Sequence, residues 1–368
     1  MRARCHRAGA RPAADRLRAV RLYGIGDLRF EVIPVRRELG PQDVRIRVRA
    51  AGVCGSDLHN FRTGQWMRQL PITPGHEFAG EVAEVGAGVT DFKCGDLVLG
   101  DSRVSCGRCP SCRAGRPNVC ERMGYVGEVC DGAFAEMIDL PAERLLTVPH
   151  GVPLQVAALA EPLGVALRVV RRLDPAKDSP IVIAGAGPIG GLAAILLNHL
   201  GFGPLGIIER NTDRAGLVAS LTGAFILGAG PAGSAGPVAS AGADVVRRFA
   251  GQSGLRYAIE ATGSRAMVNG LLGSLTGGGR LAMVGLFRGE PAFDANAVVE
   301  RELEIRGCSV FCEEQREVLP LLPLLAAQLS RVISPGIPLE RLPGEYGRLI
   351  LGQSAFLKTI VEPWRPAT

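Results

Sequence analysis

The stretch IVIAGAGPIG, residues 181–190, decides the fold class of this chain of 368 residues. Four apolar residues come first, and an uninterrupted apolar run of this length is typical of a strand buried on both faces of a parallel sheet. A glycine turn follows, and Pro188 then opens a segment that extends to Leu200 with the spacing of a helix. The order of strand, glycine turn and helix predicts the first unit of an α/β domain.

Strands and helices alternate around this stretch. Such alternation predicts a doubly wound parallel sheet. The other predicted elements are a helix at 154–172, strands at 206–209, 257–260 and 280–284, and a helix at 265–275. Residues 228–243 are low in complexity, and we expect them to form a surface loop.

The glycine turn matches G-x-G-x-x-G, and its position between a strand and a helix is the context that makes this pattern a dinucleotide fingerprint. Gly185 permits the tight turn, Gly187 lets the backbone approach a pyrophosphate, and Gly190 lets helix and strand pack closely. The start of the helix offers free N–H groups and a favourable dipole to the anion. The sequence therefore predicts a dinucleotide site here, with a purely structural turn as the alternative.

Glu209 lies nineteen residues beyond Gly190, at the end of the next predicted strand. A carboxylate at that place hydrogen-bonds the hydroxyls of an adenosine ribose and repels a 2′-phosphate, which favours NAD over NADP. Arg210 and Arg214 weaken this preference, because a guanidinium can accommodate a phosphate.

Residues 18–150 follow a different pattern. Residues 44–49 and 81–85 alternate along the chain between apolar and polar or charged side chains, and residues 96–99 form a further short strand candidate. A period of two predicts half-buried strands, and many short strands punctuated by Gly and Pro predict a barrel or sandwich. We therefore expect a β-rich domain before the α/β domain.

A first group of metal-ligand residue types in the β-rich part consists of Cys54, His76 and Glu77. A thiolate, an imidazole and a carboxylate together suit zinc better than calcium or magnesium, which prefer oxygen ligands.

A second group, Cys106, Cys109, Cys112 and Cys120, has the spacing C-x-x-C-x-x-C followed by a cysteine eight positions later. Four thiolates so close in sequence can surround one zinc in a closed, structural site, and the metal would order a loop that has little to bury. The alternatives are a set of free thiols and an iron–sulfur cluster.

Composition excludes several classes of protein. The net charge of +6 is mild, only 5% of residues are aromatic, and no basic stripe is interleaved with aromatics, so we expect no nucleic-acid partner. No apolar run reaches the eighteen residues of a membrane span. The ten cysteines are clustered, which is typical of metal binding in a reducing compartment and predicts a cytoplasmic protein. Residues 1–17 lack an apolar core of the secretory type, and we expect a disordered extension.

These features, in this order, resemble the zinc-containing medium-chain dehydrogenase/reductase family, and within it the polyol and threonine dehydrogenases, which include sorbitol, butanediol and idonate dehydrogenases. The resemblance runs from Arg18 to Pro363. Its most specific pieces are CGSDLH (54–59), GHE (75–77), the cysteine spacing, EPLGVAL (161–167) and GAGPIG (185–190). It implies a GroES-like zinc-binding catalytic domain at 18–155, a Rossmann NAD-binding domain at 156–304, and a return to the catalytic domain at 305–368.

The resemblance also implies roles for single residues. Cys54, His76 and Glu77 resemble the ligands of a catalytic zinc. Glu161 resembles another carboxylate that faces the metal, and without the family it would be an acid at the start of a helix. Asp57 resembles the carboxylate that orients the ligand histidine.

Ser56 and His59 resemble the two protein members of a proton relay from the substrate; unaided, His59 would be an ordinary loop histidine. The four-cysteine group resembles the family's structural zinc site, which brings the expected total to two zinc ions per chain. The residues that resemble NAD contacts are Gly185, Gly187, Ile189, Gly190, Glu209, Arg214, Val284, Gly285, Leu286, Val310 and Phe311.

The activity implied is transfer of a hydride from a secondary alcohol to NAD(P), giving a ketone, by a homodimer or homotetramer. Asn60 and Cys312-Glu313 depart from polyol dehydrogenases, which often carry an aromatic and Arg-Tyr at these substrate-facing places. We therefore expect a substrate other than sorbitol: a sugar acid, a cyclitol, an amino sugar or an amino alcohol.

Threonine 3-dehydrogenase-like oxidation of an amino alcohol is one alternative function, and a non-catalytic zinc- and nucleotide-binding scaffold is another. Zinc-free reductases of the same fold lack both cysteine groups, so they fit this chain poorly.

Overall fold

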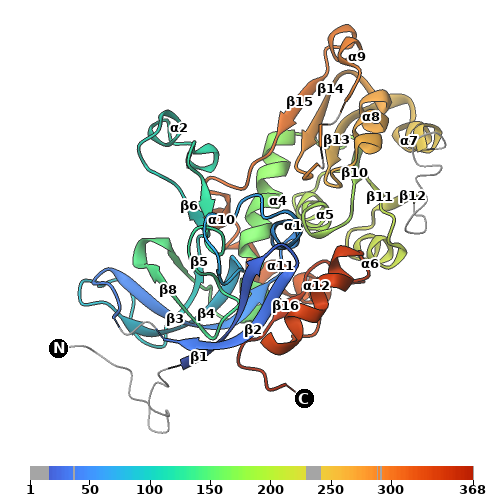
Figure 1. The fold of residues 1–368 in the computed structure, drawn as a ribbon. Helices are drawn as coiled ribbons and strands as arrows, with labels where there is room; N and C mark the ends of the chain where they lie inside the picture. Colours follow the sequence, from blue (N-terminus) through green and yellow to red (C-terminus); the bar gives the residue numbers. More distant parts are fainter. Residues whose placement is uncertain (1–15, 36–37, 229–241, 288, 291, 368) are drawn as a thin grey trace. The chain divides into compact units, whose positions relative to one another are not determined.

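The structure is a computed structural model, and it describes residues 16–35, 38–228, 242–287, 289–290 and 292–367. The chain forms two compact units, whose elements are labelled in Figure 1. The first unit contains residues 16–161, 315–354 and 358–367, and the second contains residues 162–314 and 355–357. The border thus falls inside helix α4 (Ala160–Leu173) and not at residue 155, and the chain returns to the first unit at Gln315 and not at residue 305.

The first unit is built on an antiparallel sheet with the strand order β16-β3-β4-β5-β9, in which β8 also pairs with β3. Two small ribbons, β1-β2 and β6-β7, complete its strands. The bounds are β1 Arg16–Gly24, β2 Asp27–Pro34, β3 Asp43–Gly52, β4 Glu77–Val85, β5 Leu97–Gly100, β6 Arg103–Val104, β7 Gly124–Tyr125, β8 Met137–Pro141, β9 Leu145–Thr147 and β16 Ile360–Val361.

Strand β3 shows why the alternating sequence forms this sheet. Val44, Ile46 and Val48 are fully buried, whereas Arg45 lies between them on the other face. Arg45 donates from Nε and Nη2 to the two oxygens of Asp139 at 2.8 and 2.9 Å, and Asp139 is its partner on β8. A bidentate pair of this kind sets the register of neighbouring strands as well as neutralising the charge.

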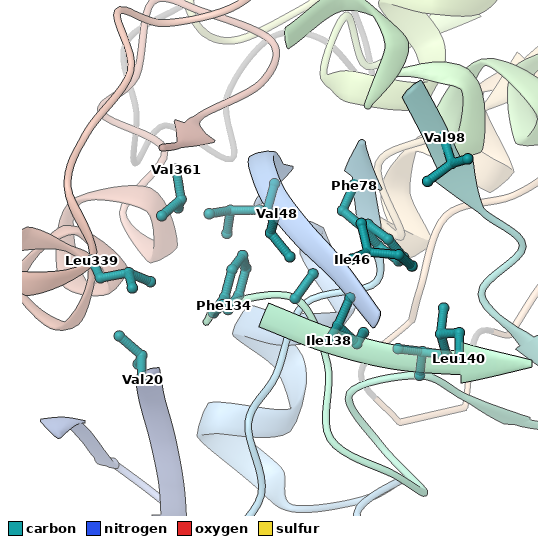
Figure 2. Close-up of a cluster of buried hydrophobic side chains, with 14 of the residues drawn as sticks. Val20, Ile46, Val48, Phe78, Val98, Phe134, Ile138, Leu140, Leu339 and Val361 are labelled. Carbon is teal, nitrogen blue, oxygen red and sulfur yellow. The ribbon is translucent and has the colours of Figure 1, made fainter. Parts of the chain in front are cut away.

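The core of the first unit joins distant parts of the sequence. Figure 2 shows Val20 of β1 and Phe134 with Leu339 and Val361 from the end of the chain, in one apolar cluster with the central strands. Residues 315–354 and 358–367 are therefore part of this core and do not form a separate element of the fold.

The second unit contains a parallel sheet with the order β12-β11-β10-β13-β14-β15. This is the doubly wound order 3-2-1-4-5-6, so the predicted α/β class is confirmed, and the strand order reverses between β10 and β13. Every residue of β10 is fully buried, as its apolar run predicts. The bounds are β10 Ile181–Ala184, β11 Leu205–Ile208, β12 Phe225–Gly228, β13 Leu255–Glu260, β14 Leu275–Met283 and β15 Glu304–Gly307.

The prediction of a helix at 154–172 is wrong in one respect, because this segment forms two helices, α3 and α4. Pro162 explains the break, because in a continuous helix it would remove a hydrogen bond and meet the carbonyl of Ala158, whereas the first turn of a new helix tolerates it. The bounds are α1 Gly55–Thr63, α2 Pro110–Arg113, α3 Leu154–Ala157, α4 Ala160–Leu173, α5 Pro188–His199, α6 Thr212–Thr222, α7 Gly242–Ala250, α8 Arg265–Ser274, α9 Ala295–Glu300, α10 Glu314–Glu317, α11 Leu321–Val332 and α12 Leu342–Ile350.

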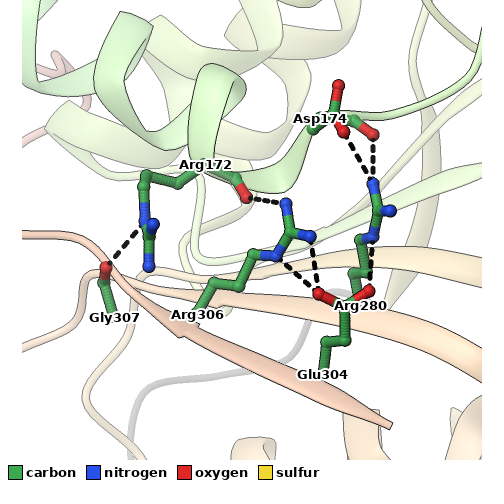
Figure 3. Close-up of polar contacts among 6 residues, drawn as sticks. All are labelled: Arg172, Asp174, Arg280, Glu304, Arg306 and Gly307. Atoms are coloured by element: carbon green, nitrogen blue, oxygen red, sulfur yellow. Dashed lines mark hydrogen bonds and ion pairs between the residues drawn. The ribbon is translucent and has the colours of Figure 1, made fainter. Parts of the chain in front are cut away.

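Arginines tie the end of α4 to the last two strands of the parallel sheet (Figure 3). Arg280 of β14 donates to Asp174 and, at 2.9 Å, to Glu304 of β15. Arg306 donates to Glu304 and to the carbonyl of Arg172. These bonds satisfy carbonyls and carboxylates at a sheet edge, and they add to the backbone pairing of β15 with β14.

Two predicted segments lie partly outside the described residues. Of the loop expected at 228–243, residues 229–241 are not described, while Gly228 ends β12 and Gly242 begins α7. Of the extension expected at 1–17, residues 1–15 are not described. Arg16 and Leu17 correct that expectation, because both are paired with β2. Within the described residues, no helix is both long enough and apolar enough to cross a bilayer.

A glycine test checks the packing of α5 on β10. A Cβ at Gly190 would lie 1.8 Å from the carbonyl oxygen of Gly185, whereas a Cβ at Gly216 of α6 would meet no atom within 4 Å. We expect Gly190→Ala to lower the stability of the fold by about 1–3 kcal/mol or more. Gly216→Ala should raise it by about 0.5–1 kcal/mol. Thermal unfolding followed by circular dichroism measures both, and an unchanged midpoint for Gly190→Ala would contradict the close contact.

Candidate active site

Three predicted ligands meet in the first unit. Cys54 lies between β3 and α1, and His76 and Glu77 stand where β4 begins. Their ligand atoms all lie within 4.8 Å of one another. Oε2 of Glu77 is buried and has no hydrogen-bond partner among the described residues. Buried polar atoms without partners are costly, so a group of sulfur, nitrogen and oxygen donors of this kind fits a bound zinc.

The backbone before His76 explains why the sequence carries glycine there. Gly75 has φ of 97°, a conformation that glycine adopts without strain, and a Cβ on it would meet the ring of Phe134 at 2.9 Å. The ring thus holds the start of β4 in place, and with it the direction of the two ligands that follow.

Helix α1 places two polar side chains beside His76. Oγ of Ser56 lies 3.5 Å from Nε2 of His76, and Oδ1 of Asp57 lies 3.6 Å from its Nδ1. The other oxygen of Asp57 accepts a 2.9 Å bond from the backbone N–H of Cys54, so this carboxylate also fixes the first turn of α1. A carboxylate beside the second nitrogen of a ligand histidine orients the ring.

His59 lies one turn further along α1. Its Nε2 is 2.7 Å from Oε1 of Gln65, and its ring stacks on Trp66 with 4.5 Å between centroids. Asn60 accepts the backbone N–H of Trp66 at 3.2 Å, which fixes the segment that carries the indole. The histidine is therefore held by neighbours that no local sequence pattern indicates.

Glu161 is not among the three residues that meet within 4.8 Å. Its Oε1 accepts a 3.3 Å bond from Ser102, and the side chain is buried. Burial, and then the charge of Glu77, raise the pKa of Glu161 to about 7.

Lys358 is a residue of this site that sequence reasoning missed. Its Nζ contacts Oε1 of Glu77 and donates to the carbonyl of Val53 at 3.2 Å, and both side chains of the ion pair are at most 1% exposed. Burial acts to lower the pKa of Lys358, but the charges of Glu77 and Cys54 outweigh it and raise the pKa. Lys358 lies 281 positions from Glu77 in the chain, so only the fold brings them together.

The four predicted cysteines of the second group also meet, with ligand atoms within 4.8 Å of one another. Sγ of Cys109 lies 3.9 Å from Sγ of Cys120. Two sulfurs of a tetrahedral zinc site with Zn–S bonds of about 2.3 Å are separated by about 3.8 Å. The backbone N–H groups of Arg108 and Cys109 lower the pKa of Cys106 to about 6, which favours the thiolate that binds metal. This group fits a structural zinc.

Eight of the described cysteines, including both ligand groups, are free thiols, as the clustering predicts. Cys94 departs from that expectation, because it is in a disulfide.

The predicted dinucleotide turn lies in the second unit, at the carboxyl end of β10. Gly185 has φ of 92°, and Gly187 caps α5 with no atom within 4 Å of where its Cβ would be. Glu209 follows β11, and its Oε2 accepts the backbone N–H of Ala186 at 2.7 Å. Glu209 is thus held against the glycine turn, where we expect its carboxylate to bind the adenosine ribose.

Arg214 lies in the first turn of α6, where the charge of Glu209 acts on it. Nε of Arg214 is buried and has no hydrogen-bond partner among the described residues. Burial lowers the pKa of Arg214, and the negative charge of Glu209 acts in the opposite direction. Ile189 lies in the first turn of α5.

Other expected NAD contacts lie beyond β14 and β15. Val284 and Gly285 both donate from the backbone to the carbonyl of Glu260, a fully buried acid at the end of β13 that sequence analysis did not single out. Leu286 is 53% exposed. Val310 and Phe311 follow β15, with φ of 37° at Val310, and Phe311 is buried.

A zinc-type ligand group in a β-rich unit and a dinucleotide turn in a doubly wound unit define a class of zinc-dependent oxidoreductases. Comparison with known proteins identifies the class further. Residues 40–150 match the alcohol dehydrogenase GroES-like domain, and residues 188–326 match the zinc-binding dehydrogenase domain. The chain belongs to the zinc-containing medium-chain alcohol dehydrogenase family, and it is accordingly an oxidoreductase that acts on secondary alcohols with NAD(P).

Individual relatives agree with this assignment. L-threonine 3-dehydrogenase of Chelativorans sp. strain BNC1 is 33% identical over 73% of this chain and 77% of its own. The crystal structure of 2R,3R-butanediol dehydrogenase from Bacillus subtilis has a TM-score of 0.83 and 28% identity, covering 94% of this chain and 99% of that one. A Sinorhizobium meliloti 1021 protein assigned as a zinc-binding dehydrogenase and bound to NADP has a TM-score of 0.84 and 29% identity, over 95% and 99%.

The ion pair of Lys358 and Glu77 yields a stability test. Removing one partner of a buried pair leaves an uncompensated charge, so we expect Lys358→Met to cost about 3–5 kcal/mol in protein stripped of metal. Adding Glu77→Gln should restore most of that loss, because the remaining charge is then gone. Exposed Lys93→Met is the control and should change stability by less than about 0.5 kcal/mol. Urea denaturation measures all three, and equal effects at Lys358 and Lys93 would contradict the pairing.

Proposed function

We propose that this chain oxidises a secondary alcohol to a ketone at the centre formed by Cys54, His76 and Glu77, with NAD as the hydride acceptor. One observation carries the proposal. Three different ligand types converge there, buried and in part without partners, in a chain that also has a dinucleotide turn. Closed structural zinc sites in proteins use four residues, whereas a site of three ligands leaves a position for substrate.

The side chains around the centre divide the remaining work. A zinc held by the three ligands supplies a Lewis acid that lowers the pKa of a substrate hydroxyl toward neutrality. Ser56 accepts the proton of that hydroxyl while it passes its own hydroxyl proton on toward His59, and the position of its Oγ beside His76 supports this role. His59 is the outer member of the relay, held by Gln65 and Trp66.

Three further residues support the centre without touching the reacting carbon. Asp57 orients the ring of His76. Lys358 offsets the charge of Glu77 and so reduces the repulsion between the Cys54 thiolate and the nearby carboxylates. Glu161, buried next to this group, is the further carboxylate that can face the metal.

The relatives and the departures at Asn60 and Cys312-Glu313 support a narrower substrate class. Sorbitol is not expected. A relative named L-threonine 3-dehydrogenase supports an amino alcohol, and the butanediol dehydrogenase supports a vicinal diol. Sugar acids, cyclitols and amino sugars remain in the proposed class, since all carry a secondary hydroxyl.

The protein is proposed to contain two zinc ions per chain and to work in the cytoplasm as a homodimer or homotetramer. The second zinc belongs to the four-cysteine group. Family resemblance supports the oligomer, and the free thiols of both ligand groups support a reducing compartment.

Two cysteine variants separate the catalytic from the structural metal. Cys54→Ala should contain about one zinc per chain in place of about two, bind NADH normally, and lose at least about 100-fold in oxidation of butane-2,3-diol, because a catalytic ligand is gone. Cys109→Ser should lose the other zinc together with thermal stability. Metal analysis, NADH fluorescence and turnover measure these properties, and full activity of Cys54→Ala would refute the proposed centre.

Coenzyme preference depends on Glu209. Its carboxylate is expected to repel a 2′-phosphate, so the wild-type enzyme should show a higher kcat/KM with NAD than with NADP. Glu209→Gln keeps an acceptor for the Ala186 N–H but removes the charge, and the ratio of the two kcat/KM values should fall by about 10-fold, equivalent to about 1.4 kcal/mol. Asp213→Asn removes an exposed charge nearby and should leave the ratio unchanged. Preference for NADP in the wild type would overturn the proposal.

A further inference from the structure

A buried carboxylate that the proposed chemistry does not use, Glu128, lies beside the catalytic ligands. It ends a turn in which its N–H donates to the carbonyl of Tyr125 at 2.9 Å. Gly127 within this turn has φ of 82°, and a Cβ on it would lie 2.8 Å from the backbone nitrogen of Gly75. The turn is therefore pressed against the residue that precedes His76. The rings of Tyr125 and His76 are 6.2 Å apart, which places the turn at the ligand group.

Within the described residues, the Glu128 carboxylate accepts one hydrogen bond, which comes from the helix that carries Ser56. Nδ2 of Asn60 donates to Oε1 of Glu128 at 3.0 Å, between two side chains that are 3% and 5% exposed. Asn60 lies four residues after Ser56 in α1, so both occupy one face of the helix, with a rise of about 6 Å between them. Glu128 thus faces the same side of α1 as the proposed proton acceptor.

Glu128 has no cationic partner among the described residues. Its other oxygen, Oε2, accepts no hydrogen bond from the part of the chain that the structure describes. The charges that favour its ionised form are those of His76 and then Arg68, and Arg68 donates from its guanidinium to the carbonyl of Met123. Burial raises the pKa of Glu128 to about 7. Buried carboxylates are ordinarily paired or protonated, so this one is ready to take a cation.

The charges around the centre favour a cation as well. Cys54 as thiolate, Asp57 and Glu77 carry three negative charges when ionised, which a zinc ion and Lys358 balance. Glu161 and Glu128, whose pKa values are raised to about 7, add up to two more as they ionise. A cationic substrate reduces this excess, whereas an anionic one increases it.

We propose that Glu128, held by Asn60, is the subsite for a substrate ammonium group, so that the preferred substrate is an amino alcohol with its amine next to the hydroxyl that is oxidised. This inference rests on the proposed function, because it assigns a substrate class to the same centre. It also assigns a role to Asn60, which holds Glu128 and stands where polyol dehydrogenases often carry an aromatic. An aromatic side chain offers no comparable amide donor to a carboxylate.

A matched pair of substrates tests the subsite in the full-length, zinc-loaded enzyme. The compounds 1-amino-2-propanol and 1,2-propanediol share a carbon skeleton. At the carbon next to the secondary alcohol, the first carries an ammonium group and the second a hydroxyl. Glu128→Gln removes the charge but keeps the acceptor for Asn60. We expect kcat/KM for the amino alcohol to fall by about 10- to 100-fold, and kcat/KM for the diol to change by less than about 3-fold.

Calorimetric titration of the same two compounds gives a readout that does not need turnover. The amino alcohol should bind the Glu128→Gln variant about 10-fold or more weakly than the wild type, and the diol should bind both equally. Glu143→Gln, at an exposed glutamate of the same unit, is the control for a lost charge and should change neither compound. Zinc content and circular dichroism verify that both variants are folded and loaded.

The outcomes separate this inference from the function on which it rests. Equal losses for both compounds in Glu128→Gln, or no loss for either, overturn the ammonium subsite while alcohol oxidation stands. Absence of oxidation of any secondary alcohol by the wild type overturns the proposed function, and the calorimetric comparison then still decides whether Glu128 binds an amine.

Discussion

The close approach of backbone at Gly75 is the constraint on which the centre depends. Cβ atoms on Gly127 and Gly132 would each meet Gly75 within 3 Å, and a Cβ on Gly75 would meet the ring of Phe134. Such contacts leave room for no side chain, so the start of β4 is fixed from both sides. His76 and Glu77 take their direction from this backbone, and Glu128 is brought beside them by the same contact.

Much of the fold and both ligand groups could be predicted from the sequence, because the signals are local. The run 181–184 is apolar over its whole length and is buried as β10, and the alternation in 44–49 is the alternation of β3. Ligands such as Cys109 and Cys112 are three positions apart, so their meeting requires only a short loop. Helix ends were less predictable; the break before α4 depends on where a proline may stand in a turn.

Residues that act across the fold could not be predicted in this way. Lys358 reaches Glu77 over 281 positions, and Glu128 reaches Asn60 over 68. No periodicity or spacing connects such pairs; burial alone shows that each charge needs a partner. Asn60 stands where polyol dehydrogenases often carry an aromatic, and its bonds to Glu128 and to the N–H of Trp66 give a physical account of that departure.

The late position of Lys358 has a consequence for how the protein is made. Val361 and Leu339 also enter the first core from the end of the chain, and β16 adds its strand to β3. During synthesis Glu77 leaves the ribosome 281 positions before Lys358, so until that later segment follows, the sheet is unfinished and Glu77 has no counter-charge. The catalytic centre should therefore assemble only after Lys358 and β16 have been made, and a premature stop shortly before Lys358 would be as damaging as loss of a ligand.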